Sequence, residues 1–157
     1  MRNYIFQIST EKVDRENYLN EYTMVNGSNT EIDWCADIDE NDREKEITRL
    51  VNDVLPKGMF TRIDENTIRY NGGMEQWKME IIAKYKERVE AITPDNYFDY
   101  SSIYGLECFC EDPLCGGCLF YLNDSGYAES SQVFMNYVDQ LEKESLLYIG
   151  GVVMYHS

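Results

Sequence analysis

Apolar side chains recur at every second position near the N-terminus, at Tyr4, Phe6 and Ile8. A period of two is typical of β-strands, because successive side chains point to opposite faces, and it predicts a strand over 3–9. The apolar segment 146–155 is also predicted to form a strand, which closes the chain. The segments 59–63 and 67–71 are two short runs in the first half of the chain that contain aromatic and β-branched residues. Asp64-Glu65-Asn66 separates them with residues that favour a tight turn, so the two segments are predicted to form a β-hairpin.

Two more strands are predicted around a turn that is rich in cysteine and glycine. The segments 103–110 and 117–122 contain aromatic and small apolar residues, and the stretch from Pro113 to Gly117 joins them. Because Pro and Gly favour turns, the two segments are expected to form consecutive strands. Gly150-Gly151 interrupts the last strand of the protein and predicts a bend or bulge there.

Four segments have the spacing of three and four residues that is typical of helices, namely 11–22, 39–55, 74–92 and 131–145. Three of these segments have an apolar stripe that is expected to face a core. The stripes consist of Ile47, Leu50, Val51, Val54 and Leu55; of Trp77, Ile81, Ile82, Tyr85, Val89 and Ile92; and of Phe134, Tyr137, Val138 and Leu141.

This mixture of hairpins and helices predicts the α+β class. A chain of 157 residues has the usual length of one domain, and no linker rich in Pro, Gly or Ser divides it. We therefore predict that 1–157 is a single domain with a mixed or antiparallel sheet and helices mainly on one face. The helices 39–55 and 74–92 should both lie on that face. The first 110 residues also fit an elaborated ferredoxin-like βαββαβ unit.

The net charge of −15 bears on which kinds of molecule the protein can bind. The charged residues are unevenly distributed along the chain. Residues 66–98 contain five acids and five bases, whereas 99–157 contain nine acids and Lys143 as the single base. Such a surface repels nucleic-acid backbones and anionic membranes, so neither is expected as a direct partner. The acidity either serves solubility alone or attracts a basic protein.

Most chemistries that depend on histidine are disfavoured, because His156 is the single histidine and it is the penultimate residue. The glycine-rich sequences that bind nucleotide phosphates are also missing. No apolar run approaches the roughly 18 residues that a membrane span needs, and the apolar stretch at the N-terminus is too short for a signal peptide. We expect a soluble, cytoplasmic protein, and the missing motifs favour a function other than catalysis while leaving an enzyme as an open alternative.

Four clustered cysteines are the most specific feature of the sequence. Cys108, Cys110, Cys115 and Cys118 have the spacing C-x-C-x4-C-x2-C. Four thiolates can complete a tetrahedral zinc shell, so structural zinc is the one candidate cofactor. However, the loop over 108–118 is tight for four ligands, and the acids around it add further negative charge. Reduced cysteines that pack in the fold are therefore an alternative, and disulfide or redox chemistry is a third.

An aromatic run offers a second candidate site. It consists of Tyr97-Phe98-Asp99-Tyr100 together with Tyr104, Phe109, Phe120 and Tyr121, and tyrosine mixed with Asp, Ser and Asn is typical of interfaces. The alternative is that all of these rings pack in the core or at its boundary.

These observations favour binding over catalysis. The expected function is an acidic protein-interaction module that binds a basic protein partner, in the manner of an inhibitor, an immunity protein or a nucleic-acid mimic. The alternative is a zinc-stabilised binding module organised by the four-cysteine loop at 108–118. An enzyme that works without histidine is the third hypothesis. The sequence leaves the oligomeric state open.

Overall fold

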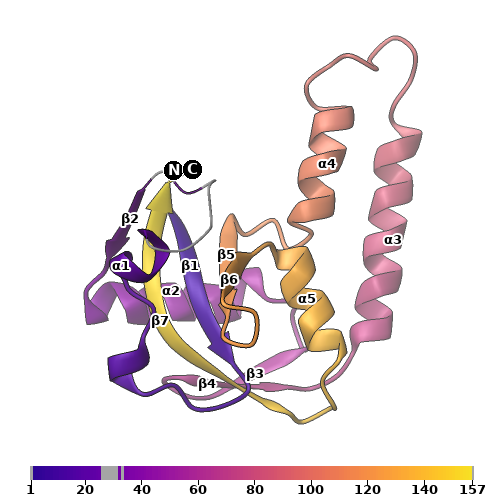
Figure 1. Cartoon of the computed structure of the whole chain (residues 1–157). Helices are drawn as coiled ribbons and strands as arrows, with labels where there is room; N and C mark the ends of the chain where they lie inside the picture. Colours follow the sequence, from indigo (N-terminus) through magenta and orange to yellow (C-terminus); the bar gives the residue numbers. More distant parts are fainter. Residues whose placement is uncertain (1, 26–31, 33, 157) are drawn as a thin grey trace.

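The computed structural model describes residues 2–25, 32 and 34–156. Within these residues, seven strands form one sheet (Figure 1). The strands are β1 Asn3–Ser9, β2 Trp34–Asp37, β3 Phe60–Asp64, β4 Thr67–Tyr70, β5 Cys118–Leu122, β6 Tyr127–Glu129 and β7 Leu146–His156. Their order is β3-β4-β7-β1-β5-β6, and β2 pairs with the second half of β7. The sheet is mixed, because β1 and β5 are parallel while the other pairs are antiparallel.

The helices lie mainly on one face of this sheet, as the sequence predicts. They are α1 Glu21–Val25, α2 Glu40–Arg49, α3 Met74–Glu90, α4 Ile103–Glu111 and α5 Ser131–Asp139, with a 3-10 turn over Arg15–Asn17 and a π-helical turn over Leu50–Val54. The side chain of Asp39 begins α2 by accepting the amide hydrogen of Asp42 at 2.8 Å, and that of Ser130 begins α5 by accepting from Val133. None of the helices in the described residues is long and apolar enough to cross a membrane.

The larger core lies between the sheet and helices α2 and α5. Phe120 on β5 stacks on Phe134 of α5, with ring centroids 4.1 Å apart and planes 7° apart. Phe6 and Ile8 on β1 face this core, while Ile5 faces a smaller core under the segment that contains α1. The alternation along β1 therefore distributes its side chains between two faces, as a period of two requires.

A β-bulge at Gly150-Gly151 confirms the interruption that the sequence predicts in the last strand. The register changes from Phe6 opposite Val152 to Ile8 opposite Ile149, so two glycines face the single residue Gln7. A Cβ atom on Gly151 would overlap the backbone of Leu19, which explains why glycine stands there. The chain passes this point closely enough that no larger side chain fits.

Two buried side chains hold the bulge in place. The Oε1 atom of Gln7 accepts hydrogen bonds from the amides of Leu19 and Gly151, both at 2.7 Å. Its Nε2 atom donates to the carbonyl of Asn17 and to Asn123, both at 3.0 Å. From α2, the guanidinium of Arg43 donates to the carbonyl of Gly150 at 2.7 Å. The polar groups that the bulge leaves unpaired are thus satisfied by side chains.

Three expectations about local structure are wrong. The segment predicted as a strand over 103–110 is helix α4, because a helix brings Phe109 onto α3, and short apolar runs do not distinguish the two structures. The segment predicted as a helix over 11–22 is a 3-10 turn followed by the short α1. The helix predicted over 131–145 ends at Asp139.

The ferredoxin-like expectation for the first 110 residues is also wrong. That unit needs a sixth element that is a strand, and the chain forms α4 there instead. It also needs strands of the first half to be neighbours in the sheet, whereas β7 lies between β4 and β1. The last strand of the chain is long enough to pair with β1 along its length while its two halves pair with β4 and β2.

Helices α3 and α4 project from the sheet as a two-helix hairpin, which we call the arm and define as residues 74–112 (Figure 1). Met74 and Ile81 of α3 are buried, as is Phe109 of α4. The expectation that the whole apolar stripe of α3 packs on the sheet is wrong, because Ile82 and Val89 are about half exposed, at 51% and 52%. The start of α3 lies near the sheet, and its later turns extend away from it.

Candidate protein-interaction surface

The arm has a small core of its own. The Phe109 ring on α4 meets Tyr85 of α3 edge to face, with centroids 4.9 Å apart. The guanidinium of Arg88 covers the same ring at 4.3 Å from its centroid. Edge-to-face rings and a cation over a ring are both attractive arrangements. Phe109 therefore joins the two helices of the arm.

The loop 91–102 at the end of the arm is held by Asn96. The Nδ2 atom of Asn96 donates to the carbonyl of Ala91 at 2.9 Å, and its Oδ1 atom accepts from the amide of Thr93 at 2.8 Å. The backbone carbonyl of Asn96 accepts from the Ser102 hydroxyl at 2.7 Å. One side chain thus closes the end of α3, while its backbone ties the loop to the start of α4. This role is missed in the sequence, where Thr93-Pro94-Asp95 indicates the end of a helix and nothing more.

Four aromatic rings project from this loop and from the start of α4. We call them the aromatic tip, and they are Tyr97, Phe98, Tyr100 and Tyr104. Phe98 is 94% exposed and Tyr100 is 76% exposed, while the other two are about half exposed. The rings associate in two pairs, with centroids 5.0 Å apart for Tyr97 and Phe98 and 4.6 Å apart for Tyr100 and Tyr104. Exposed apolar rings grouped in this way indicate a surface that meets a partner.

Phe109 and Phe120, by contrast, are buried. The two interpretations of the aromatic residues therefore apply to different parts of the chain. The rings of the loop 91–102 and the start of α4 are exposed, whereas Phe109 near the end of α4 and Phe120 on β5 are packed. No local pattern in the sequence separates the two groups.

The charge around the aromatic tip is negative. Between residues 89 and 142 the sequence contains ten acids and no Lys or Arg. Asp95 and Asp99 flank the aromatic tip and are exposed. Hydrogen bonds with Tyr100 and with the Cys108 thiol raise the pKa of Tyr104 to about 12, so its hydroxyl stays neutral at neutral pH. The loop and α4 are thus aromatic and acidic, and Arg88, the nearest preceding base in the sequence, has its guanidinium on the Phe109 ring.

The four cysteines of the predicted zinc site occupy different environments. Cys108 and Cys110 are exposed on α4, and two residues apart on a helix do not face the same side. Cys108 lies beside Tyr104, while Cys110 lies beside Tyr85. Cys115 is exposed in the turn before β5, with φ at 54°. Cys118 is buried at the start of β5, where its sulfur accepts from the Nη2 atom of Arg49 at 3.3 Å.

These positions do not form a ready zinc shell. Among the described residues, no three His, Cys, Asp or Glu side chains are grouped so that they could hold a metal ion. Burial raises the pKa of the Cys118 thiol, although the nearby guanidinium of Arg49 lowers it. Zinc binding by these cysteines remains a prediction, and elemental analysis of the purified protein tests it.

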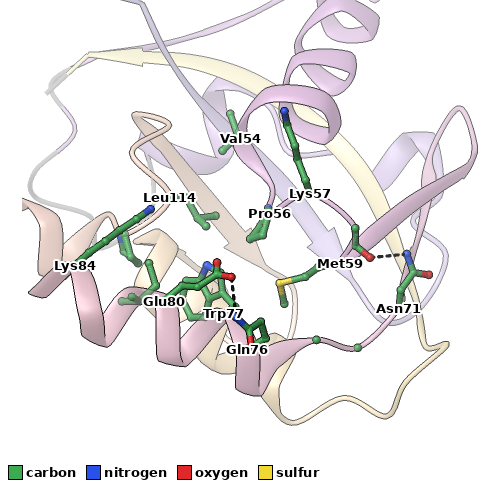
Figure 2. A pocket seen from close by; sticks show the side chains of 15 residues that line it. Val54, Pro56, Lys57, Met59, Asn71, Gln76, Trp77, Glu80, Lys84 and Leu114 are labelled. Carbon is green, nitrogen blue, oxygen red and sulfur yellow. Dashed lines mark hydrogen bonds between the residues drawn. The ribbon is translucent and has the colours of Figure 1, made fainter.

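A cleft of about 530 Å³ lies at the base of the arm, between α3 and the loop before β3 (Figure 2). Its apolar side includes Met59, Trp77 and Leu114. Its polar groups are engaged with neighbours: Glu80 accepts from Gln76 at 3.0 Å, and Asn71 donates to the carbonyl of Gly58 at 3.2 Å. The remaining groups do not converge on one point, so the aromatic tip is the stronger candidate site.

Comparisons with protein-family models, with curated proteins and with solved structures find no match to this chain. The functional argument therefore depends on the geometry of the arm and on the charge of the chain.

Proposed function

We propose that this protein is a non-catalytic interaction module that binds a basic protein partner through the aromatic tip. One observation carries the proposal. Phe98 is 94% exposed on a loop that its own hydrogen bonds hold in place. A folded protein gains nothing for its own stability from a ring in water, whereas burial of a Phe side chain at an interface contributes about 1.5–3 kcal/mol.

The order of the loop supports this assignment. Binding costs conformational entropy when a flexible loop has to become ordered, and a loop that is already held avoids part of that cost. Asn96 holds 91–102 before any partner arrives. Aromatic residues at the centre of an interface also carry a large share of binding energy.

The charge supports a basic partner. The aromatic tip lies within a stretch of 54 residues, 89–142, that has no Lys or Arg. Carboxylates such as Asp95 and Asp99 attract cations on the partner, and Lys or Arg side chains can also pack on the faces of the tyrosine rings. An inhibitor, an immunity protein and a nucleic-acid mimic would all use such a surface.

The experiment compares capture by the wild-type chain with capture by Phe98→Ala/Tyr100→Ala. The wild type should retain a basic protein that the double variant does not retain. Tyr127→Ala is the matched control, because Tyr127 is half exposed on β6, outside the arm. Direct titration of the identified protein should show weaker binding as salt rises from roughly 50 to 500 mM, since salt screens exposed charges. A partner that is acidic, or that binds the double variant as well as the wild type, contradicts the proposal.

A further inference from the structure

Helix α3 has an exposed strip that neither the sheet nor α4 covers. We define the strip as Glu75, Met79, Ile82, Lys86 and Val89. Met79 is 65% exposed, and Ile82 and Val89 are each about half exposed. The residues follow one another at intervals of four, three, four and three, which places them on one flank of an α-helix. This flank is separate from the side of α3 on which Tyr85 and Arg88 contact α4.

The strip is complementary to itself when a second copy runs in the opposite direction. If Met79 of one copy faces Ile82 of the other, the two-fold axis that relates the copies passes between residues 80 and 81 of each helix. The same two-fold axis places Glu75 of one copy opposite Lys86 of the other. In this antiparallel arrangement each acid of the strip meets a base, and each of the two central apolar residues meets an apolar residue. A two-fold interface requires such a self-complementary surface. Intervals of four and three are also those at which paired helices bury side chains between them.

We propose that two copies of this chain associate through antiparallel pairing of their α3 helices along this strip. The charge distribution supports a second copy as the occupant. Helix α3 contains four acids and four bases, so it is neutral in a chain whose net charge is −15. Two copies can approach one another at α3 without the repulsion that their acidic surfaces would impose elsewhere.

The pair Glu75 and Lys86 cannot form within one chain. Eleven residues separate them, which corresponds to about 16 Å along a helix. Within its own helix, Glu75 lies 3.5 Å from Lys78, in an exposed ion pair. An exposed pair of this kind contributes little and leaves the Glu75 carboxylate free to meet a second copy.

The dimer should be weak. A strip of four helical turns on each copy buries less than the roughly 1,200 Å² that stable complexes reach. We therefore expect a dissociation constant between about 10 μM and 1 mM.

The experiment is sedimentation of the full chain at about 150 mM salt, where charges farther apart than about 8 Å are screened. The average mass should rise above the 18.4 kDa of one chain as the concentration increases. Lys86→Glu should weaken association by about tenfold or more, because it places two carboxylates opposite one another at both ends of the strip. The double variant Glu75→Lys/Lys86→Glu should restore it, because the opposite charges then face each other again.

Lys84→Glu is the matched control. It alters the net charge by the same amount on the same helix, but Lys84 lies on the side that lines the cleft (Figure 2). It should leave association within about threefold of wild type, because exposed charges off the interface have small effects. Ile82→Gln provides a second test that leaves every charge in place, and it should also weaken association.

Three outcomes would overturn the proposal: a monomer throughout the concentration range, an equal loss from Lys84→Glu and Lys86→Glu, or no rescue by the double variant. Circular dichroism shows whether each variant keeps its helices. None of these substitutions lies in the aromatic tip. The test of self-association and the test of partner capture can therefore each fail while the other succeeds.

Discussion

The sheet and the arm both contain phenylalanine, but in different environments. In the sheet, Phe120 is fully buried and stacks on Phe134, so its burial stabilises the fold. In the arm, Phe98 is 94% exposed, and its one ring contact in the described residues is with the neighbouring Tyr97. Apolar residues in the sheet therefore contribute to folding, whereas our proposal assigns those at the end of the arm to binding. The burial of an aromatic residue in the folded protein therefore has to be known before its role can be assigned.

The arm is also held together differently. The sheet draws on two cores and on polar side chains that satisfy its bulge. The outer part of the arm depends on the contact of Phe109 with Tyr85 and Arg88 and on the hydrogen bonds of Asn96. Such a region can be altered at its surface with little cost to the stability of the whole protein. Substitutions in the two regions should therefore differ in their effect on the free energy of unfolding, which can be measured.

The largest expected effect comes from one substitution made in both regions. Phe120→Ala should lower the free energy of unfolding by about 3–5 kcal/mol, because it leaves a cavity against Phe134. Phe98→Ala should change it by no more than about 0.5 kcal/mol. Urea denaturation followed by circular dichroism measures both. Similar losses for the two variants would show that the exposed ring has a structural role and would remove the contrast.

A second prediction concerns the polar centre of the sheet. Gln7→Leu should lower the free energy of unfolding by about 2–4 kcal/mol, because the buried amides of Leu19 and Gly151 lose their acceptor. Gln76→Leu, at an exposed position on α3, is the matched control and should have almost no effect. If the two variants are equally stable, the bulge does not depend on Gln7.

A third prediction sharpens the description of the arm as a separate unit. Asn96→Ala removes two side-chain hydrogen bonds and should destabilise the loop locally by about 1–2 kcal/mol. Amide hydrogen exchange should therefore become about tenfold faster within 91–102 while β1 and β7 keep their protection. Faster exchange throughout the sheet would mean that the loop and the sheet unfold together.

The smallest expected effect is a dependence on alkaline pH that originates in the sheet and α5. Burial and a 2.8 Å hydrogen bond to Asp124 raise the pKa of Tyr137 from 10.0 to about 12, and burial raises that of Tyr155 to the same range. The unfolded chain loses these protons first, so stability should fall as pH rises from about 10 to about 12.

Tyr137→Phe removes one of the two groups, so it should make this decline shallower without abolishing it. Urea midpoints measured from pH 9 to 12 provide the comparison with the wild type. Identical slopes in the two proteins would contradict the assignment to Tyr137.

Local patterns predict many of the elements. A period of two predicts β1, a turn between two short runs predicts β3 and β4, and the apolar segment near the C-terminus predicts β7. The periods of three and four predict α3 close to its observed ends, and the predicted helix 39–55 corresponds to α2 followed by the π-helical turn over Leu50–Val54. The glycine pair in the last strand predicts the bulge, because a bulge needs backbone that a side chain would obstruct. These predictions succeed because they depend on residues that are near one another along the chain.

The segment over 103–111 shows the limit of such patterns. Its aromatic and cysteine residues fit a strand as well as a helix, and the packing of Phe109 onto Tyr85 and Arg88 decides in favour of the helix. The same change separates the cysteines, because a helix turns Cys108 and Cys110 to different sides. The spacing of the cysteines alone predicts a zinc site, whereas the positions of the four thiols depend on the packing of α4 against α3.

The amino-acid sequence is enough to predict the α+β class, the acidity of the chain and the local preference for most strands and helices. Only the folded chain shows the order of strands around β7, the projection of the arm and the exposure of Phe98. Backbone preference and hydrophobic period are local properties, so they can be read along the chain. Burial depends instead on which distant segments meet. Ile81 and Val89 both belong to the apolar stripe of α3, yet Ile81 is buried at the base of the arm beside the cleft, whereas Val89 is half exposed.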